Sequence, residues 1–214
     1  MKKNNLILTA VVITAMTLTS SGGSSTNTEV KIGNQVWTTT NLDVSKFKNG
    51  DDIPQATTAE AWRKAGEDRK PAWCYYNNDS DNGAKYGKLY NWHAVTDPRG
   101  LAPSGWHIPS DAEWTTLTDN LGGEDVAGHK MKSRAGMDYE GNGSNASGFS
   151  GLPGGNRYND GAFYDVRSFG YWWSSTEGNT NNAWYRYLSG NNGNVYRSSS
   201  SSKADGFSVR CLRD

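Results

Sequence analysis

The sequence predicts a single α+β domain, with helices in the first half and a β-rich, loop-rich C-terminal half. Helix signals, namely capping residues followed by apolar side chains at helical spacing, all precede Gly136. After Gly136, short strand-like runs alternate with Gly-rich turns. Nine Trp, eleven Tyr and 25 Gly, against 35% hydrophobic residues, indicate a core of a few large aromatic side chains joined by tight turns.

Length and charge narrow the classes of function. Without its N-terminal segment the chain provides one domain of roughly 180 residues, which is enough to bury about 70% of the unfolded surface. Lys plus Arg and Asp plus Glu number 22 each, so the net charge is zero. This balance gives no electrostatic basis for binding nucleic acid or an anionic membrane surface.

Residues 1–20 are predicted to be an export signal peptide. A basic start precedes Leu6–Met16, an apolar stretch too short to span a bilayer. Ser21 then stands where a bacterial lipoprotein processing site would place its lipid-bearing Cys. Two localisations stay open: a secreted or periplasmic protein, or, if Ser21 replaces a natural Cys, a lipoprotein of the outer membrane or cell surface. Residues 21–29 are predicted to be a flexible tether, followed by the domain at 30–214.

Two helices are predicted from capping boxes, in which a Ser or Thr is followed three residues later by Glu. Thr57 with Glu60 begins the first, and Ser110 with Glu113 begins the second. Gly122 and its neighbouring glycine end the second helix. The apolar residues on one face of the second helix are Trp114, Leu117 and Leu121.

Three further elements are predicted in the first half. Val30–Leu42 carries an Asn-bearing turn between apolar runs and is typical of a hairpin. Tyr86–Val95 is interpreted as a short helix or turn, and Asp125–Lys132 as a weaker helix.

The two cysteines have two interpretations. Cys74 lies in a strand-like run and Cys211 in the final strand. Two cysteines in an exported protein indicate one disulfide. The alternative is two small buried residues in separate places, since free Cys is often buried.

No catalytic or metal-binding constellation is recognised. His93, His107 and His129 have no partners at metal-ligand spacing and are interpreted as structural. The Asp-rich stretch that begins at Asp79 has Tyr90 at its twelfth position, where a calcium loop needs Glu, so a solvated turn is expected and a looser calcium site is the alternative. No serine lies in a nucleophile elbow. We therefore expect no cofactor, no metal and no enzyme activity.

The segment 178–205 has an unusually narrow composition. Of its 28 residues, 6 are Asn, 6 Ser, 3 Gly and 3 Tyr. Flexible linkers share the Ser and Gly but lack the aromatic residues. Binding loops combine Tyr with small polar residues, because Tyr offers a large contact area at low entropic cost. The segment therefore indicates a binding surface, and a polar surface hairpin without a ligand is the alternative.

Alternation along the segment predicts a hairpin with two different faces. One face would carry the scaffold residues Trp184, Leu188 and Val195, together with Arg186 and Arg197. The other would face solvent and bind the ligand. Its predicted residues are Tyr185, Tyr187, Ser189, Asn191, Asn192, Asn194, Tyr196, Ser198, Ser199, Ser200 and Ser201.

Six blocks of sequence carry a family resemblance. They are Gly87–Trp92, Gly105–Trp114, Ser147–Phe149, Leu152–Arg157, Trp173–Glu177 and Gly206–Cys211. In this order they resemble the Fibrobacter succinogenes major paralogous domain over about Val30–Asp214. The resemblance implies a C-type-lectin-like fold of the group that includes formylglycine-generating enzymes, and an exported or surface lipoprotein. The redox Cys pair of that enzyme branch and the calcium–sugar motifs of the lectins are absent from the sequence, so neither activity is implied.

A narrower resemblance concerns the C-terminal segment. Its position, its composition and the Gly206–Cys211 block after it resemble the variable proteins of diversity-generating retroelements. That resemblance implies a diversified surface that binds a protein or glycan ligand, on another cell or on a phage. The alternative is a fixed-sequence structural or carbohydrate-associated surface protein of the same family.

Overall fold

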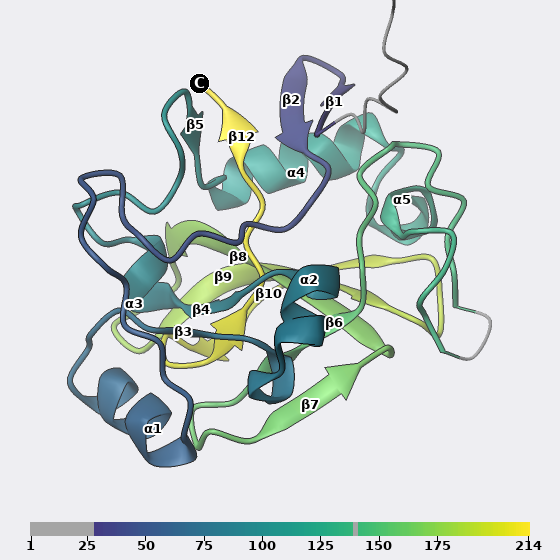
Figure 1. Cartoon of the computed structure of the whole chain (residues 1–214). Coiled ribbons are helices and arrows are strands. Elements are labelled where there is room, and N and C mark those ends of the chain that lie inside the picture. Colours follow the sequence, from purple (N-terminus) through teal and green to yellow (C-terminus); the bar gives the residue numbers. More distant parts are fainter. Residues whose placement is uncertain (1–27, 139–140) are drawn as a thin grey trace, which may run out of the picture.

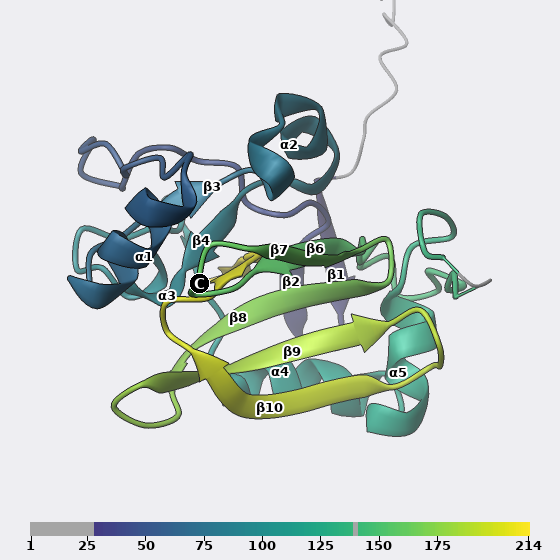
Figure 2. The ribbon, with the colours of Figure 1, turned by 90° about the horizontal axis from the view of Figure 1, so that it is seen from below.

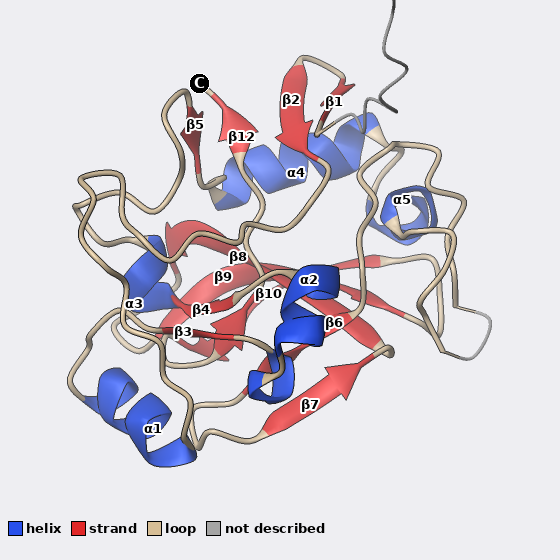
Figure 3. Cartoon of the chain, in the orientation of Figure 1, coloured by secondary structure: helices blue, strands red, loops and turns tan. Residues whose placement is uncertain are grey.

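The computed structural model describes residues 28–138 and 141–214, and these form the predicted α+β fold (Figures 1 and 3). The predicted signal peptide and most of the predicted tether lie outside the described residues. The first strand begins at Glu29, one residue before the predicted start of the domain. Among the described helices, none combines the length and apolarity needed to cross a bilayer.

Within residues 28–138 and 141–214, short helices and twelve strands follow the chain, and the second half consists of strands and loops as predicted. The helices are α1 (Ala59–Glu67), the 3₁₀ helix η1 (Tyr76–Asn78), α2 (Ser80–Tyr86), α3 (Trp92–Val95), α4 (Asp111–Asn120) and α5 (Glu124–Met131). The strands of the first half are β1 (Glu29–Ile32), β2 (Gln35–Thr38), β3 (Trp73–Cys74), β4 (Leu89–Asn91) and β5 (Trp106–His107). Those of the second half are β6 (Gly154–Arg157), β7 (Phe163–Val166), β8 (Phe169–Glu177), β9 (Asn182–Ser189), β10 (Val195–Ser202), β11 (Gly206–Phe207) and β12 (Leu212–Arg213).

The strands form two sheets. A small sheet has the order β1-β2-β12-β5 and so joins the first and last strands of the domain. The large sheet has the order β10-β9-β8-β6-β11-β4-β3, and β7 pairs with β6 beside this path. Figure 2 shows β8, β9 and β10 side by side, with α4 and α5 behind them. The predicted C-terminal hairpin thus lies at the edge of the large sheet, with β10 as the outermost strand.

The helix predicted from Ser110 is confirmed as α4. Ser110 Oγ accepts a hydrogen bond from the Glu113 amide, and the Glu113 carboxylate accepts one from the Ser110 amide at 2.8 Å. Trp114 and Leu117 are fully buried, and Leu121 is nearly so. They pack between the small sheet and the face of the large sheet that α4 covers.

The helix predicted from Thr57 begins one residue later than expected. Thr58, not Thr57, is the N-cap of α1, and its side chain accepts a hydrogen bond from the Ala61 amide at 3.0 Å. Glu60 lies three residues after Thr57, and this spacing favoured Thr57 as the cap. Thr58 carries the same hydroxyl group, and the point at which the backbone becomes helical makes Thr58 the N-cap.

This assignment predicts a difference between two neighbouring substitutions. Thr58→Ala should lower the free energy of unfolding by about 1 kcal/mol, because it removes the side-chain cap. Thr57→Ala should change it by less than about 0.5 kcal/mol, as at ordinary surface sites. Urea denaturation of both variants measures the difference. Equal effects would contradict Thr58 as the cap.

Tyr86–Val95 contains more structure than predicted. The end of α2, the strand β4 and the short helix α3 all fall within it. Residues of β4 are buried next to the β3 edge of the large sheet, where Tyr90 pairs with Phe207 of β11 and with Trp73 of β3. A three-residue strand gives too short a pattern to be recognised from alternation.

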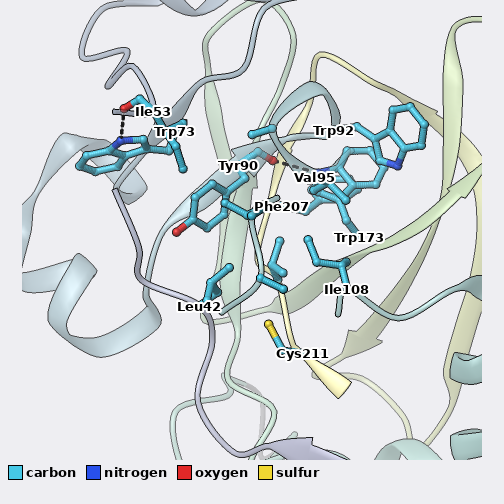
Figure 4. Packing of buried hydrophobic residues seen from close by; sticks show 14 of the residues in the cluster. Leu42, Ile53, Trp73, Tyr90, Trp92, Val95, Ile108, Trp173, Phe207 and Cys211 are labelled. Carbon is cyan, nitrogen blue, oxygen red and sulfur yellow. Dashed lines mark hydrogen bonds between the residues drawn. The ribbon is translucent and has the colours of Figure 1, made fainter. Parts of the chain in front are cut away.

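The main core lies around β4, β11 and the middle of β8 (Figure 4). Two indole N–H groups in it donate to backbone carbonyls, Trp73 to Ile53 at 2.8 Å and Trp173 to Tyr90 at 2.9 Å. The Phe207 ring packs against Trp173, with ring centroids 4.2 Å apart. A core built from large aromatic residues with satisfied N–H groups agrees with the composition.

Of the two interpretations of the cysteines, the structure agrees with two small buried residues in separate places and not with a disulfide, because Cys74 and Cys211 are both free and buried. Cys74 packs in a small cluster with Trp62 and Tyr76, whereas Cys211 belongs to the main core. Burial raises the pKa of the Cys74 thiol to about 11 and that of Cys211 to about 12. Both thiols therefore stay protonated at neutral pH, which lowers their reactivity.

Candidate binding surface

The predicted C-terminal hairpin is confirmed as the antiparallel pair β9–β10. Tyr196 lies opposite Tyr187, and Arg197 lies opposite Arg186. The register shifts between Ser198 and Ser201, so a bulge interrupts the serine run. We call this pair, Asn182–Ser202, the β9–β10 hairpin.

One face of the hairpin lies against α4 and α5, as the alternation predicted. Leu188 and Val195 are buried there with Trp172 of β8. Arg186 and Arg197 bind the same carboxylate, that of Asp111, at 2.6 and 2.7 Å.

Asp111 joins the N-terminus of α4 to both strands of the hairpin. Burial opposes its charged form, but hydrogen bonds from Arg197 and Arg186 outweigh this effect and hold the pKa of Asp111 below its ordinary value. Arg186 is almost fully buried, so its charge depends on this partner. The two arginines of the Asn/Ser-rich segment are therefore structural residues.

The opposite face carries a stack of two tyrosines. The rings of Tyr187 and Tyr196 are nearly parallel, with centroids 4.5 Å apart and planes at 8°. Both are partly exposed, and the Asn192 side chain donates a hydrogen bond to the Tyr196 hydroxyl at 2.7 Å. Asn191 and Asn192 are exposed at the turn. This end of the hairpin presents aromatic faces beside amide groups to solvent.

Two residues predicted to face solvent are buried instead. Tyr185 is 7% exposed and Ser189 is 4% exposed. The Tyr185 ring lies 5.0 Å from that of Phe207 and 6.1 Å from that of Trp173, both in the main core. Alternation placed Tyr185 on the correct face, but Phe207 of β11 and Trp173 of β8 cover that face at this point.

Trp184 also differs from its predicted place. It was expected in the core, but its side chain is only partly buried, and the Arg197 guanidinium lies 3.8 Å above its ring centroid. This contact joins β9 to β10, the outermost strand of the large sheet.

The serine run is divided between several environments. Ser200 is exposed, whereas Ser198, Ser199 and Ser201 are partly buried. The hydroxyl groups of Ser198 and Ser200 lie 3.0 Å apart, and the Tyr185 hydroxyl is 3.4 Å from that of Ser200. The hydroxyl groups of Ser198 and Ser200 thus lie next to the hydroxyl end of Tyr185.

The turn of the hairpin is held by the helix predicted at Asp125–Lys132, which the structure places at Glu124–Met131 (α5), and this contact was not predicted from the sequence. The buried Lys132 ammonium donates to the carbonyls of Ser189 and Asn192 at 3.0 and 2.7 Å. The His129 amide donates to the Gly193 carbonyl at 2.9 Å. Gly128 permits this approach, since a Cβ there would lie 2.2 Å from the Asn194 carbonyl oxygen. The turn backbone is therefore fixed, while the Asn191 and Asn192 side chains stay exposed.

A second polar cluster joins the C-terminus to α4. His107 Nδ1 lies 2.8 Å from the Asp214 carboxylate, and Nε2 lies 3.0 Å from that of Glu113. Partial burial opposes the imidazolium, but hydrogen bonds to Asp214 and Glu113 outweigh it and raise the pKa of His107. His107 is thus a link between elements, as predicted for a structural histidine, although its ring is 38% exposed rather than buried.

This cluster predicts a pH dependence of stability. Because the folded pKa of His107 is raised above 6.5, its contribution is fully present below about pH 6.5 and is lost as pH rises through the folded pKa. The stability difference between the protein and a His107→Gln variant should therefore shrink between about pH 6 and 8. Urea denaturation across this range measures it. A difference that grows with pH would contradict the assignment.

A cavity of about 470 Å³ lies outside the hairpin, between α2 and the segment that follows β2. Its polar walls are already engaged: Asn41 bonds the Tyr86 carbonyl and three other groups, and Asp43 pairs with Lys88 at 2.6 Å. Across residues 28–138 and 141–214, His, Cys, Asp and Glu side chains form no group of three suited to hold a metal ion. The β9–β10 hairpin remains the candidate site.

A family model described as the Fibrobacter succinogenes major domain matches residues 30–213. No curated protein and no solved structure matches the chain. The matched region includes both sheets from β2 to β12 and the whole β9–β10 hairpin.

Proposed function

The chain belongs to the Fibrobacter succinogenes major domain family, and from that premise we propose that it is an exported ligand-binding protein whose ligand surface is the solvent-facing side of the β9–β10 hairpin. The proposal assigns the protein a receptor- or adhesin-like role without a catalytic step. Its ligand is a protein or glycan on another cell or on a phage.

The observation that carries the proposal is the separation of two kinds of residue within one short segment. Arg186, Leu188 and Arg197 point to α4 and hold the hairpin in place. Tyr187 and Tyr196 lie on the other side with rings accessible to solvent. A surface of this kind can change its contact residues without loss of the fold, because the contacts that hold it are made by different side chains.

The fixed turn supports the proposal further. Lys132 and the α5 backbone hold the chain between β9 and β10 through main-chain groups. Backbone contacts do not depend on side-chain identity, so Asn191 and Asn192 are free to vary. A fixed loop also loses little entropy on binding, which favours affinity.

The corrected ligand surface is smaller than the sequence predicted. It retains the tyrosines Tyr187 and Tyr196, with Tyr185 as their buried support. Around them lie the polar residues Asn191, Asn192, Ser198 and Ser200. The Asn194 side chain instead donates a hydrogen bond to Asp125 of α5 at 3.3 Å, on the side that holds the hairpin. Interface energy usually concentrates in a few aromatic or Arg residues, so the two tyrosines are the proposed anchors.

A display library tests this assignment. Tyr187, Asn191, Asn192, Tyr196 and Ser200 would be randomised together, and clones would be scored separately for folding and for binding to a panel of unrelated proteins and glycans. Most clones should fold, because surface substitutions usually change stability by less than about 0.5 kcal/mol. Some clones should bind panel members that the parent does not bind.

A matched library at Arg186, Leu188, Val195 and Arg197 is the control. These residues lie in the same two strands but face α4 and α5, so most clones of this library should fail to fold. The binding assignment is wrong if the two libraries fold equally poorly, or if the first library folds and yields no binder to any panel member.

We further propose that the segment 178–205 is diversified by a retroelement. The support is its Asn, Ser, Gly and Tyr composition, since an Asn codon becomes a Ser, Gly or Tyr codon when its adenines are replaced. Its place on a hairpin with a separate scaffold face is the second support. The coding sequence would then have a near-copy beside a reverse transcriptase gene, differing only at adenines. Sequencing the locus decides this, and a locus without such a copy leaves a surface of fixed sequence.

A further inference from the structure

Aromatic side chains outside the Asn/Ser-rich segment continue the tyrosine surface of the hairpin. On β8, the ring of Tyr171 lies 5.7 Å from that of Tyr187, and Phe169 lies 5.9 Å from Tyr171. Tyr158 and Tyr164, near and on β7, are 43% and 44% exposed, with ring centroids 4.7 Å apart. We call this set, Tyr158, Tyr164, Phe169, Tyr171, Tyr187 and Tyr196, the aromatic surface.

Asp165 connects the two halves of the aromatic surface. It lies in β7 next to Tyr164, and its carboxylate accepts a hydrogen bond from the Tyr171 hydroxyl at 2.7 Å. Burial raises the pKa of both Tyr158 and Tyr171, and the negative charge of Asp165 raises them further. The electrostatic influence of Asp165 therefore reaches the exposed Tyr158.

No cation within β6 to β10 is left to balance this carboxylate. Residues 154–202 contain four arginines and no lysine. Arg157 donates to backbone carbonyls beneath the surface, and Arg167 pairs with Asp138. Arg186 and Arg197 share Asp111 on the opposite face of the sheet. The aromatic surface therefore combines electron-rich tyrosine rings with a carboxylate. The arginines of β6 to β10 do not add a positive charge to it.

We propose that the aromatic surface and Asp165 bind an arginine side chain of a protein partner, with the guanidinium against the Tyr158–Tyr164 pair. Tyrosine faces attract cations through the ring quadrupole, and Arg is the commonest cation in such contacts. A carboxylate beside the rings adds a charge-assisted hydrogen bond with defined geometry. This inference rests on the proposed binding function, and it names the partner as a protein with exposed arginine rather than a neutral glycan.

The inference assigns separate roles to two parts of one surface. Tyr158, Tyr164 and Asp165 lie outside segment 178–205, so they would supply a constant contact to arginine. Tyr187, Tyr196 and the turn asparagines would then select among partners that carry it.

Calorimetric titration of the protein with an octa-arginine peptide tests the proposal. An octa-citrulline peptide, which keeps the shape of arginine without its charge, should bind at least about tenfold more weakly. Asp165→Asn and Tyr158→Ala should each weaken octa-arginine binding by about tenfold. Tyr158→Phe should retain most of the binding, because it keeps the aromatic ring.

Asp119→Asn is the matched control for charge, since Asp119 is exposed at the end of α4 and the substitution removes the same charge away from the aromatic surface. It should leave octa-arginine binding unchanged. Thermal melting of each variant confirms that it is folded. Asp165 has a φ of 67°, a conformation that Asn tolerates, so this variant should fold.

Several results would overturn the inference. Equal binding of octa-citrulline, or equal weakening by Asp119→Asn and Asp165→Asn, would show that no specific arginine site exists. Binding of a neutral dextran that is lost in Tyr158→Ala, without octa-arginine binding, would assign the surface to glycans. The hairpin library is an independent measurement: binders that do not depend on Tyr158 or Asp165 would retain the proposed function and reject this inference alone.

Discussion

Replacing Arg210 with Met is expected to lower the free energy of unfolding by about 3–5 kcal/mol, because several buried acceptors lose their hydrogen bonds at a cost of about 1–3 kcal/mol each. The Arg210 side chain is fully buried and stands between β11 and β12. Its guanidinium donates to the carbonyls of Thr38, Phe149 and Ser150 at 2.7, 2.7 and 3.0 Å. It also donates to the Asn41 side chain at 2.7 Å.

The expected loss is large because Met removes four donors but leaves their acceptors in place. A buried polar group without a partner costs about 1–3 kcal/mol. The acceptors come from the end of β2, from the segment after it and from the segment before β6, so Arg210 joins distant parts of the chain to the C-terminal strand. Domains of this size have a total stability of only about 5–15 kcal/mol, so the variant should unfold at much lower urea concentration.

Two further variants make the Arg210 prediction specific. Arg213→Met removes a half-exposed arginine three residues later, which pairs with Glu29, and should cost less than about 1 kcal/mol. Arg210→Lys keeps the charge with fewer donors in a different geometry and should fall between the two. Equal urea midpoints for Arg210→Met and Arg213→Met would contradict the structural role of Arg210.

Replacing Trp114 with Ala should lower the free energy of unfolding by about 3–5 kcal/mol, since it leaves a large cavity in the core. Trp114 is fully buried between the sheets. Its ring centroid lies 4.8 Å from that of Trp37 and 5.8 Å from that of Phe149. The cavity would open where α4, the small sheet and the large sheet meet.

Trp114→Phe is the control for this prediction. The Trp114 indole N–H has no hydrogen-bond partner among the described residues, so Phe loses no hydrogen bond and keeps an aromatic ring in place. It should cost clearly less than Ala. Thermal denaturation of both variants measures this, and a melting temperature that Trp114→Ala leaves unchanged would reject the core assignment of α4.

Local signals predicted the elements they depend on. The Ser110–Glu113 capping box and the face of Trp114 and Leu117 predicted α4, because a helix cap and a helical stripe are set by residues within a few positions of each other. The alternation along segment 178–205 predicted the β9–β10 hairpin for the same reason. The three-residue strand β4 has too little sequence to show a period and was not recognised.

Contacts between distant segments could not be predicted in this way. Lys132 carries no motif, yet it holds the hairpin turn through two carbonyls. Asp111 was recognised only as part of the α4 start, and its pairing with Arg186 and Arg197 depends on how α4 lies on the sheet. The aromatic surface combines residues of β7, β8 and the hairpin. The hydrogen bond between Tyr171 and Asp165, which no sequence pattern predicts, shows that β7 and β8 contribute to the same face.

The sequence by itself therefore determined the α+β class, the family, α4, the hairpin and which residues of β9 and β10 share a side, since all of these depend on local period and motif. Only the tertiary structure decided which of the residues on one side of the hairpin are exposed to solvent. Tyr187 and Tyr185 follow the same alternation, but Phe207 and Trp173 cover Tyr185 and leave Tyr187 partly exposed. Burial depends on what packs against a residue from elsewhere in the chain, and alternation along a strand carries no information about that neighbour.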